Sequence, residues 1–486
     1  MRTFTFSRFT TRLRAAYAAD PRRPRAAFLA VLAVVVSLMS VKYAAKIAKP
    51  GDTGQQSRSA FLRWREMVNG VFAGENIYVG KNEYPNPPVM ALVLRPFAAL
   101  PPTAGALAWF YTKVLLAALA AVWAFRLLED NGGECERAAQ ASRAPDPGAP
   151  AALTPSLRRD LARAAAVTLC LAPLLGDLLH NNVNIFILFL VAGCLEAFRR
   201  RLDALAGLTL ALAIACKVTP ALFVAYFAYK RCWRLLAAAL VGLALWLAVV
   251  PGLVFGFDRN NELLRGWSAL MIERPLLKGE VTTEHPNQAV TGFVYRLFTH
   301  SPSYIVYEKT PEGDIPTPGE YHTLVDIGRP AAWVVVKALT ALFALAVVVL
   351  CRAPVRGAAD PRQGWRVAAE CGLICLGMLL FSERTWKHHA VVLLLPFASL
   401  AYAVAAVELP RRVRGLVLAV LLLSPVLMVA PGLLGGRGAD LALVYGTHTV
   451  AFVLQAVAVC AVLACRSDRL GGACGLCGSG GEPIPG

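Results

Sequence analysis

Charged residues are scarce in this chain of 486 residues, because Asp, Glu, Lys and Arg together make up only 16% of it. Soluble domains have about 25%, whereas here 57% of the residues are hydrophobic and the mean hydropathy is +0.54. Apolar segments of membrane-spanning length recur from one end of the sequence to the other. The composition excludes a soluble domain with a single anchor and predicts an all-α polytopic membrane protein.

Several catalytic signatures are missing as well. The sequence has no Walker-type phosphate loop, no GxGxxG after a strand, no HExxH and no Asp-x-Asp pair. Nucleotide chemistry, dinucleotide binding, zinc proteolysis and metal dependence therefore have no motif in their favour, and no cofactor is predicted. One CxxC, Cys474 to Cys477, has no second pair, so a disordered tail is the simpler interpretation.

Acidic residues are outnumbered by basic ones, 31 against 49, which gives a net charge of +18. The surplus suggests nucleic acid at first sight, but it lies at the N-terminus and in short loops, as the positive-inside rule expects. Arginine clusters at 22–25, 199–201 and 411–414 mark the cytoplasmic face. We therefore expect both termini in the cytoplasm and external loops at about 49–88 and 257–330. No external loop contains cysteine, so no disulfide framework is implied.

The apolar segments predict a helical bundle with about 10–12 transmembrane helices. Residues 1–25 form a basic cytoplasmic N-terminus, 26–465 a single transmembrane catalytic domain, and 466–486 a disordered cytoplasmic tail. The segment 205–227 is too short for two spans and is interrupted at Lys217-Val218-Thr219-Pro220. It fits a pair of short re-entrant helices, which membranes tolerate where they line a cavity. Residues 61–72 predict an amphipathic helix suited to the outer interface.

Polar residues gather in stretches that this topology places on the outer face, and Lys217 can reach the same face. A lysine near a helix centre costs roughly 2.5–3.5 kcal/mol, so it normally faces a cavity or a partner. Cationic and imidazole donors suit a phosphate group, and a loop carboxylate suits a general base. The candidates are Asp52, Glu66, His180, Asn181, Asn182, Asn184, Lys217, His285, Asn287, Gln288, Arg384 and His388.

Two of these stretches are expected to act through helical spacing. If 382–389 is helical, Arg384 and His388 stack one turn apart, and His180 and Asn184 share a face for the same reason. The alternatives are structural. Amide and imidazole groups also cap helices, and cations beside a membrane also snorkel to its surface.

Five local matches occur in chain order. Ala73–Tyr78 with Tyr84–Pro88 is similar to Ala-Gly-x-x-x-Tyr and Tyr-Pro-Pro segments, and Asn181–Asn184 stands in the place of Gly-Gln-x-Asn. Lys217–Pro220 is similar to Lys-x-Thr-Pro, Asn287-Gln288 to an Asn-Gln pair, and Ser382–His389 to a late polar turn. Together they resemble glycosyltransferase family 87, mannosyltransferase-like membrane enzymes that depend on polyprenyl phosphate and have the C-type glycosyltransferase fold.

The resemblance implies transfer of a mannose-like hexose, with inversion, from a polyprenyl-phosphate donor to a glycolipid or glycan acceptor outside the membrane. Lys217, Arg384 and His388 would hold the donor phosphate, and the amide and imidazole residues listed above would bind sugar or acceptor. A transporter or lipid flippase is the rival class, because it too uses broken helices and buried charges. An inactive scaffold is a third interpretation.

The general base is the point where the sequence departs from the family. The family's acidic position in the first external loop holds Ser59 and Ala60 here, which leaves Asp52 and Glu66. Glu66 is expected to pair with Arg63 or Arg65 and so to be occupied. Asp52 follows the first span directly and is the favoured base.

The topology can be tested with a thiol reagent that does not cross membranes. We expect a cysteine at Ser303, in the loop 257–330, to react in intact cells. Reaction only after lysis would place this loop in the cytoplasm and remove the argument for an external site.

Overall fold

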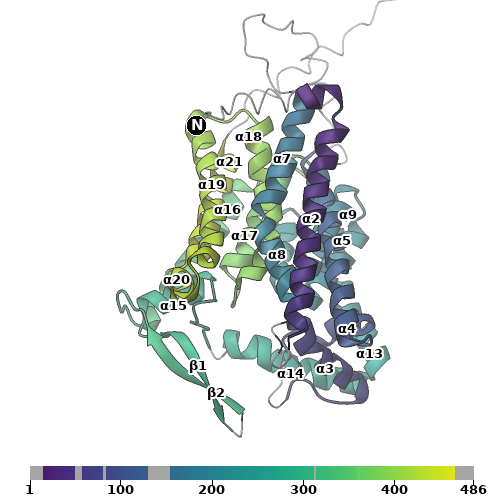
Figure 1. Ribbon diagram of the computed structural model, residues 1–486, viewed down its shortest axis with the longest axis vertical. Coiled ribbons are helices and arrows are strands. Elements are labelled where there is room, and N and C mark those ends of the chain that lie inside the picture. Colours follow the sequence, from purple (N-terminus) through teal and green to yellow (C-terminus); the bar gives the residue numbers. More distant parts are fainter. Residues whose placement is uncertain are drawn as a thin grey trace, which may run out of the picture.

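The computed structural model is a long bundle of helices with a two-stranded hairpin at one end (Figure 1). It describes residues 15–49, 57, 59–79, 84–129, 154–277, 279–310, 313–357, 360 and 362–465. Asp52, Cys474, Cys477 and the predicted tail 466–486 lie outside the described residues.

Seven helical segments in the described chain are long and apolar enough to cross a membrane. They are α2 (Arg22–Ile47), α5 (Pro102–Leu128), the run of α12 (Trp233–Ala244), η3 (Leu245–Val249) and α13 (Val250–Phe255), α16 (Arg329–Leu350), η5 (Lys387–Leu393) with α18 (Leu394–Ala406), α19 (Arg411–Leu434) and α21 (Thr447–Ala464). An eighth span results if α7 (Pro155–Leu169) and α8 (Leu171–His180), bent by 43°, are taken together. The chain is a polytopic, mostly helical membrane protein.

The other helices are shorter, and the expected number of 10–12 transmembrane helices includes several of them. Within the bundle they are α4 (Pro88–Ala98), α9 (Asn184–Arg199), α10 (Asp203–Cys216), η2 (Thr219–Ala221), α11 (Leu222–Tyr229) and α17 (Trp365–Leu380). Outside it are α3 (Ala60–Ala73), α14 (Phe257–Ser268), η4 (Ala269–Leu277), α15 (Val290–Phe298) and α20 (Gly436–Val444). Every described residue of α17 from Val367 to Leu380 is buried, so this helix forms the centre of the bundle.

The predicted break at Lys217 is confirmed. Helix α10 ends at Cys216, Lys217 is extended with φ −159° and ψ 127°, and η2 begins at Thr219. Pro220 explains the break, because proline has no N–H to donate to the carbonyl four residues earlier, that of Cys216, and its ring would clash with that carbonyl in a continuous helix. The Lys217 side chain therefore does not lie on the face of a helix.

Helix α11, which follows the break, is anchored to α17 by a buried ion pair. Lys230 Nζ lies 2.8 Å from Glu370 Oε2, and the Tyr226 hydroxyl donates to the same carboxylate oxygen at 2.9 Å. The second Glu370 oxygen accepts the backbone N–H of Ala353 at 2.6 Å. Both oxygens of the carboxylate are thus paired, as a buried charge requires.

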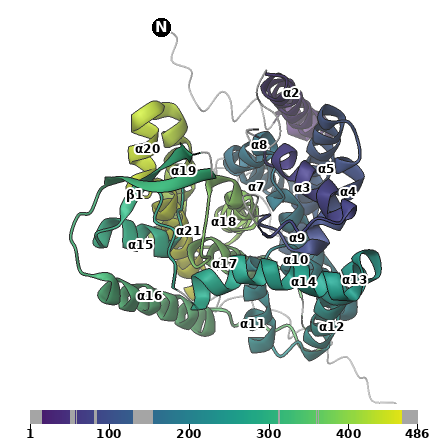
Figure 2. The same ribbon diagram turned by 90° about the horizontal axis from the view of Figure 1, so that it is seen from below.

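Non-spanning elements gather at the end of the bundle opposite the start of α2 (Figure 1). They include α3, α14 and the antiparallel strands β1 (Pro302–Thr310) and β2 (Gly313–Tyr321), which pair Tyr307 with Pro316. Seen from below, α14 lies across the helices of the bundle (Figure 2). This arrangement makes the two ends of the bundle chemically different.

Helix α3 is amphipathic as predicted, but its apolar face is not free for a membrane surface. Phe61, Trp64, Val68 and Val71 are each at most 7% exposed, because they pack within the protein core. Asn69 Nδ2 and Arg65 also donate to carbonyls at the end of α4. The expected contact of this face with the outer interface is therefore wrong.

Ser303 is a poor position for the labelling experiment, because it is fully buried and its hydroxyl bonds with Glu320 and His322. Val325 lies in the same loop and is 59% exposed. Cysteine at Val325 is the better probe, and cysteine at the exposed Arg412, at the opposite end, is the matched control. The parent chain gives the background from native cysteines.

Candidate functional site

The site begins at the turn between α8 and α9. Asn181 has the left-handed conformation, with φ 57° and ψ 42°, which asparagine adopts more readily than most residues. Its side-chain amide donates to the Tyr43 hydroxyl at 2.8 Å and to the Ala106 carbonyl at 3.0 Å. Because α8 ends at His180 and α9 begins at Asn184, the expectation that these two share one helical face is wrong.

A chain of buried polar contacts runs from this turn to the break at Lys217. Lys113 Nζ, from the middle of α5, donates to the Asp177 carboxylate at 3.1 Å and to the Asp177 carbonyl at 3.0 Å. The other carboxylate oxygen accepts from Asn184 Nδ2 at 2.9 Å, and Asn184 Oδ1 accepts from Lys217 Nζ at 2.6 Å. Asn184 therefore binds side chains and does not cap α9.

Imidazoles from two distant segments meet beside these contacts. The rings of His180 and His388 are 4.5 Å apart, and those of His388 and His389 are 4.8 Å apart. Asn182 Nδ2 lies 3.1 Å from His388 Nε2. Lys217 is an electrostatic neighbour of both His388 and His389. The late polar turn and the α8–α9 turn therefore form one site.

The turn before His388 is not helical, since the helical turn η5 begins only at Lys387. The expected one-turn stacking of Arg384 on His388 is therefore wrong. Arg384 is exposed, donates to Thr282 Oγ1 at 2.9 Å and pairs with Glu383 at 3.4 Å. It still lies close enough to His389 to interact with it electrostatically.

Sequence reasoning missed several members of this site. Lys46, Arg63 and Lys113 are electrostatic neighbours of His180, and Lys46 Nζ donates to the Leu179 carbonyl at 2.8 Å. Asp177, which pairs with Lys113, is not among the candidates from the sequence. Lys113 carried a usable signal, because it is a cation in the middle of the apolar run of α5, far from either end. We call Lys46, Arg63, Lys113, Lys217 and Arg384 the basic cluster.

Asn287 and Gln288 are fully buried, and protein groups use the whole of each amide. Asn287 donates to the carbonyls of Thr282 and Glu383 and accepts the backbone N–H groups of Ala289 and Thr385. Gln288 donates to the carbonyls of His285 and Leu443 and accepts from Thr449. Their role in binding sugar stays a prediction. In the structure, Asn287 connects the loop 282–288 to the turn 382–385.

Two further basic residues hold the same loop. Arg296 is fully buried and donates to backbone carbonyls of Thr283, Glu284 and Val444, among others. Burial lowers the pKa of Arg296 to about 10, so it stays charged at neutral pH. His285 packs on the Tyr304 ring at 4.4 Å, and burial lowers its pKa from the usual value.

Of the two predicted bases, Asp52 lies outside the described residues and Glu66 lies exposed on α3. In the described part of the chain Glu66 has no ion pair, so its expected pairing with Arg63 or Arg65 is not seen. Arg63 donates to the Ser57 carbonyl at 2.7 Å, and Arg65 to that of Leu100 at 2.9 Å. The Glu66 carboxylate is therefore available, and the argument that it is occupied no longer separates the two candidates.

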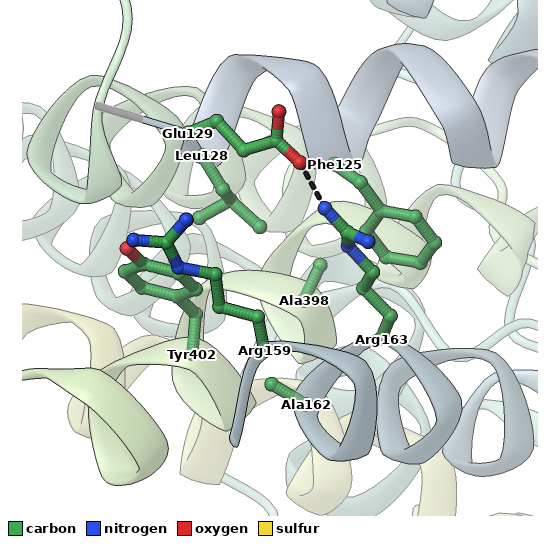
Figure 3. Close-up of a pocket in the computed structure, with 8 residues that line it drawn as sticks. All are labelled: Phe125, Leu128, Glu129, Arg159, Ala162, Arg163, Ala398 and Tyr402. Carbon is green, nitrogen blue, oxygen red and sulfur yellow. Dashed lines mark hydrogen bonds and ion pairs between the residues drawn. The ribbon is translucent and has the colours of Figure 1, made fainter. Parts of the chain in front are cut away.

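A small pocket elsewhere contains none of these candidates. It lies between α5, α7 and α18, where Arg163 pairs with Glu129 and the apolar wall includes Phe125 and Ala398 (Figure 3). Leu128, which also lines it, stands four turns beyond Lys113 on α5, or about 22 Å along the helix axis. The pocket and the basic cluster are thus separate features. Among the described residues, no group of three His, Cys, Asp or Glu side chains is arranged to hold a metal ion.

The contacts of Asn287 predict a large effect on stability. Asn287→Ala leaves two buried carbonyls and two buried N–H groups without their partner, so we expect the free energy of unfolding to fall by roughly 2–4 kcal/mol. Thermal unfolding of the purified protein measures this. Asn76→Ala removes one exposed bond to Glu262 and one acceptor of the Tyr78 backbone N–H, so it is a control with fewer lost partners and should change stability less. Equal stability of both variants would contradict the proposed anchoring.

Comparison with known proteins gives one match. Residues 84–383, more than half of the chain, match glycosyltransferase family 87. No curated protein and no solved structure matches the chain. The matched range includes the α8–α9 turn, Lys217 and the Asn287-Gln288 pair, but neither Asp52 nor Glu66. With its polytopic helical fold and the family match, the chain belongs to glycosyltransferase family 87 and is a membrane glycosyltransferase.

Proposed function

We propose that this enzyme transfers a hexose, mannose or a similar sugar, from a polyprenyl-phosphate donor to a glycolipid or glycan acceptor on the external face. The observation that carries the proposal is the Lys217 ammonium at the helix break. It has three N–H donors and one bond among the described residues, to Asn184. Two donors and a positive charge are therefore left for an anion beside the bilayer.

The donor phosphate would contact Lys217, His388 and Arg384. Their segments are far apart in sequence, yet His389 is an electrostatic neighbour of both Lys217 and Arg384. A lipid phosphate is an anion on an apolar chain, so it suits a basic cluster at one end of a membrane bundle. The imidazole of His180 and the amide of Asn182 border this position and are our candidates for contacts to the sugar.

The proposed chemistry balances without a cofactor. The acceptor hydroxyl oxygen attacks the anomeric carbon, and the bond from that carbon to the phosphate oxygen breaks. The electron pair leaves with the phosphate, which the cationic groups stabilise, and the hydroxyl proton passes to a carboxylate. A single displacement of this kind inverts the anomeric configuration.

The external placement rests on the difference between the two ends of the bundle. The arginine-rich start of α2 lies at one end, and α3, α14 and the hairpin lie at the other (Figure 1). The side chain of Lys46, near the end of α2, reaches the carbonyl of Leu179 near the end of α8. This contact supports our placement of the α8–α9 turn, and with it the proposed phosphate site, at the end that the positive-inside rule assigns to the exterior.

Lys217→Met tests the donor site, because it keeps much of the apolar stem and removes the charge. We expect binding of a polyprenyl phosphate and sugar transfer to fall at least about 100-fold, since a charged hydrogen bond to phosphate is lost. Membrane insertion should be normal. Lys337→Met on the exposed face of α16 is the matched control and should retain activity. Unchanged binding in Lys217→Met would return this lysine to a snorkelling role.

Substitution of the two loop carboxylates tests the base. We favour Asp52, because described residues that flank it in sequence contact the surroundings of this site: Lys46 donates to the Leu179 carbonyl beside the α8–α9 turn, and the Ser57 carbonyl accepts from Arg63. Asp52→Asn should lower turnover by roughly 10²–10⁴-fold while donor binding survives. Glu66→Gln is the matched control. Loss in Glu66→Gln with full activity in Asp52→Asn would reverse the assignment, and full activity in both would remove the first loop from the chemistry.

A further inference from the structure

Two fully buried charges lie beside the proposed phosphate site. Lys113 and Asp177 are each 0% exposed and form an ion pair at 3.1 Å between α5 and α8. A buried ion pair is weak evidence for a stabilising role, because desolvation offsets much of the attraction. This pair also contacts Asn184, which binds Lys217, so it can act on the proposed phosphate site.

The two oxygens of the Asp177 carboxylate bind different partners, Lys113 and Asn184. One oxygen accepts from Lys113 and the other from the Asn184 amide, whose own oxygen faces Lys217. A carboxylate accepts hydrogen bonds and cannot donate them. Asp177 therefore selects one of the two orientations of the amide, with Nδ2 toward itself and Oδ1 toward Lys217.

The contacts from Lys113 through Asp177 and Asn184 to Lys217 carry a net charge of one positive unit when both lysines and the aspartate are ionised. Lys113 and Asp177 neutralise each other, and Asn184 is neutral, so these contacts supply no net negative charge to offset an ammonium at Lys217. Without Lys113, the nearest cation to Asp177 along this chain of contacts is Lys217 itself. The carboxylate would then offset the charge that an incoming phosphate needs.

We propose that Lys113 and Asp177 are positioning residues of the donor site: Lys113 neutralises Asp177, and Asp177 orients Asn184, so that Lys217 presents an uncompensated ammonium to the donor phosphate. The inference rests on the proposed function. It names two residues that act through Asn184 and Lys217 without touching the substrate.

The single variants separate this role from a structural one, because they change the local charge in opposite directions. Lys113→Met lowers the net charge by one unit and Asp177→Asn raises it, although both break the same ion pair. One unit charge roughly 10 Å away changes affinity about tenfold at an effective dielectric constant of about 20. A purely structural pair would make both variants lose affinity together.

The experiment measures binding of farnesyl phosphate to the purified full chain, with farnesol as the neutral control. We expect Lys113→Met to weaken binding about tenfold. Asp177→Asn removes the charge but keeps an oxygen that can accept from Asn184 Nδ2, so the orientation of Asn184 is preserved and binding should equal or exceed that of the wild type. The double variant Lys113→Met/Asp177→Asn restores the net charge and should recover the binding. Lys113→Arg keeps the charge and serves as the conservative variant. Thermal unfolding, measured in parallel, should fall in both single variants.

Each outcome decides the inference. Equal losses of affinity in the two single variants, or unchanged affinity in Lys113→Met, overturn it while the proposed function stands. If Lys113→Met does not accumulate in the membrane, Asp177→Asn alone decides, because a tenfold loss there contradicts the charge argument. A wild-type protein that does not distinguish farnesyl phosphate from farnesol overturns the proposed function and this inference together.

Discussion

The buried contact between Lys113 and Asp177 is the constraint on which the site depends. A lone lysine or aspartate inside a bundle that faces lipid is costly, and each of these side chains is fully enclosed. The pair ties the middle of α5 to the end of α8, and Asn184 extends it to the start of α9. Lys217 bonds to Asn184 in turn. These contacts therefore connect the α8–α9 turn to the helix break at Lys217.

Two further sets of buried contacts hold the segments that complete the site. The amide of Asn287 joins the loop 282–288 to the turn before His388, so the imidazoles are placed by a residue that need not touch a substrate. At the far end of α11, Lys230 and Glu370 fix to α17 the short helix that follows the break. The helix break at Lys217 is therefore a rigid feature, constrained on both sides.

The sequence predicted those parts that follow from local chemistry. Pro220 predicted the break after Cys216, and the outward gathering of polar stretches predicted that the late polar turn meets the α8–α9 turn. It could not predict how the turn residues are used, because helical spacing assumes a continuous helix and Asn181 ends α8 in a left-handed conformation. It also assigned Asn287 to substrate, since a sequence does not show that four protein groups already occupy the amide. The apolar face of α3 was misplaced for the same reason, because amphipathicity does not distinguish lipid from protein as the partner.

The separation of Lys113 from Asp177 along the chain has a consequence for biogenesis. The two residues are 64 positions apart, so α5 is made and exposed to the insertion machinery before its counter-charge exists. A lysine in mid-helix costs roughly 2.5–3.5 kcal/mol on insertion scales until it is paired. Helix α5 therefore carries this cost until α8 lies beside it and supplies Asp177. A nascent chain halted between these helices would present an unpaired ammonium to the cell's quality control, whereas a chain that has passed Asp177 would not.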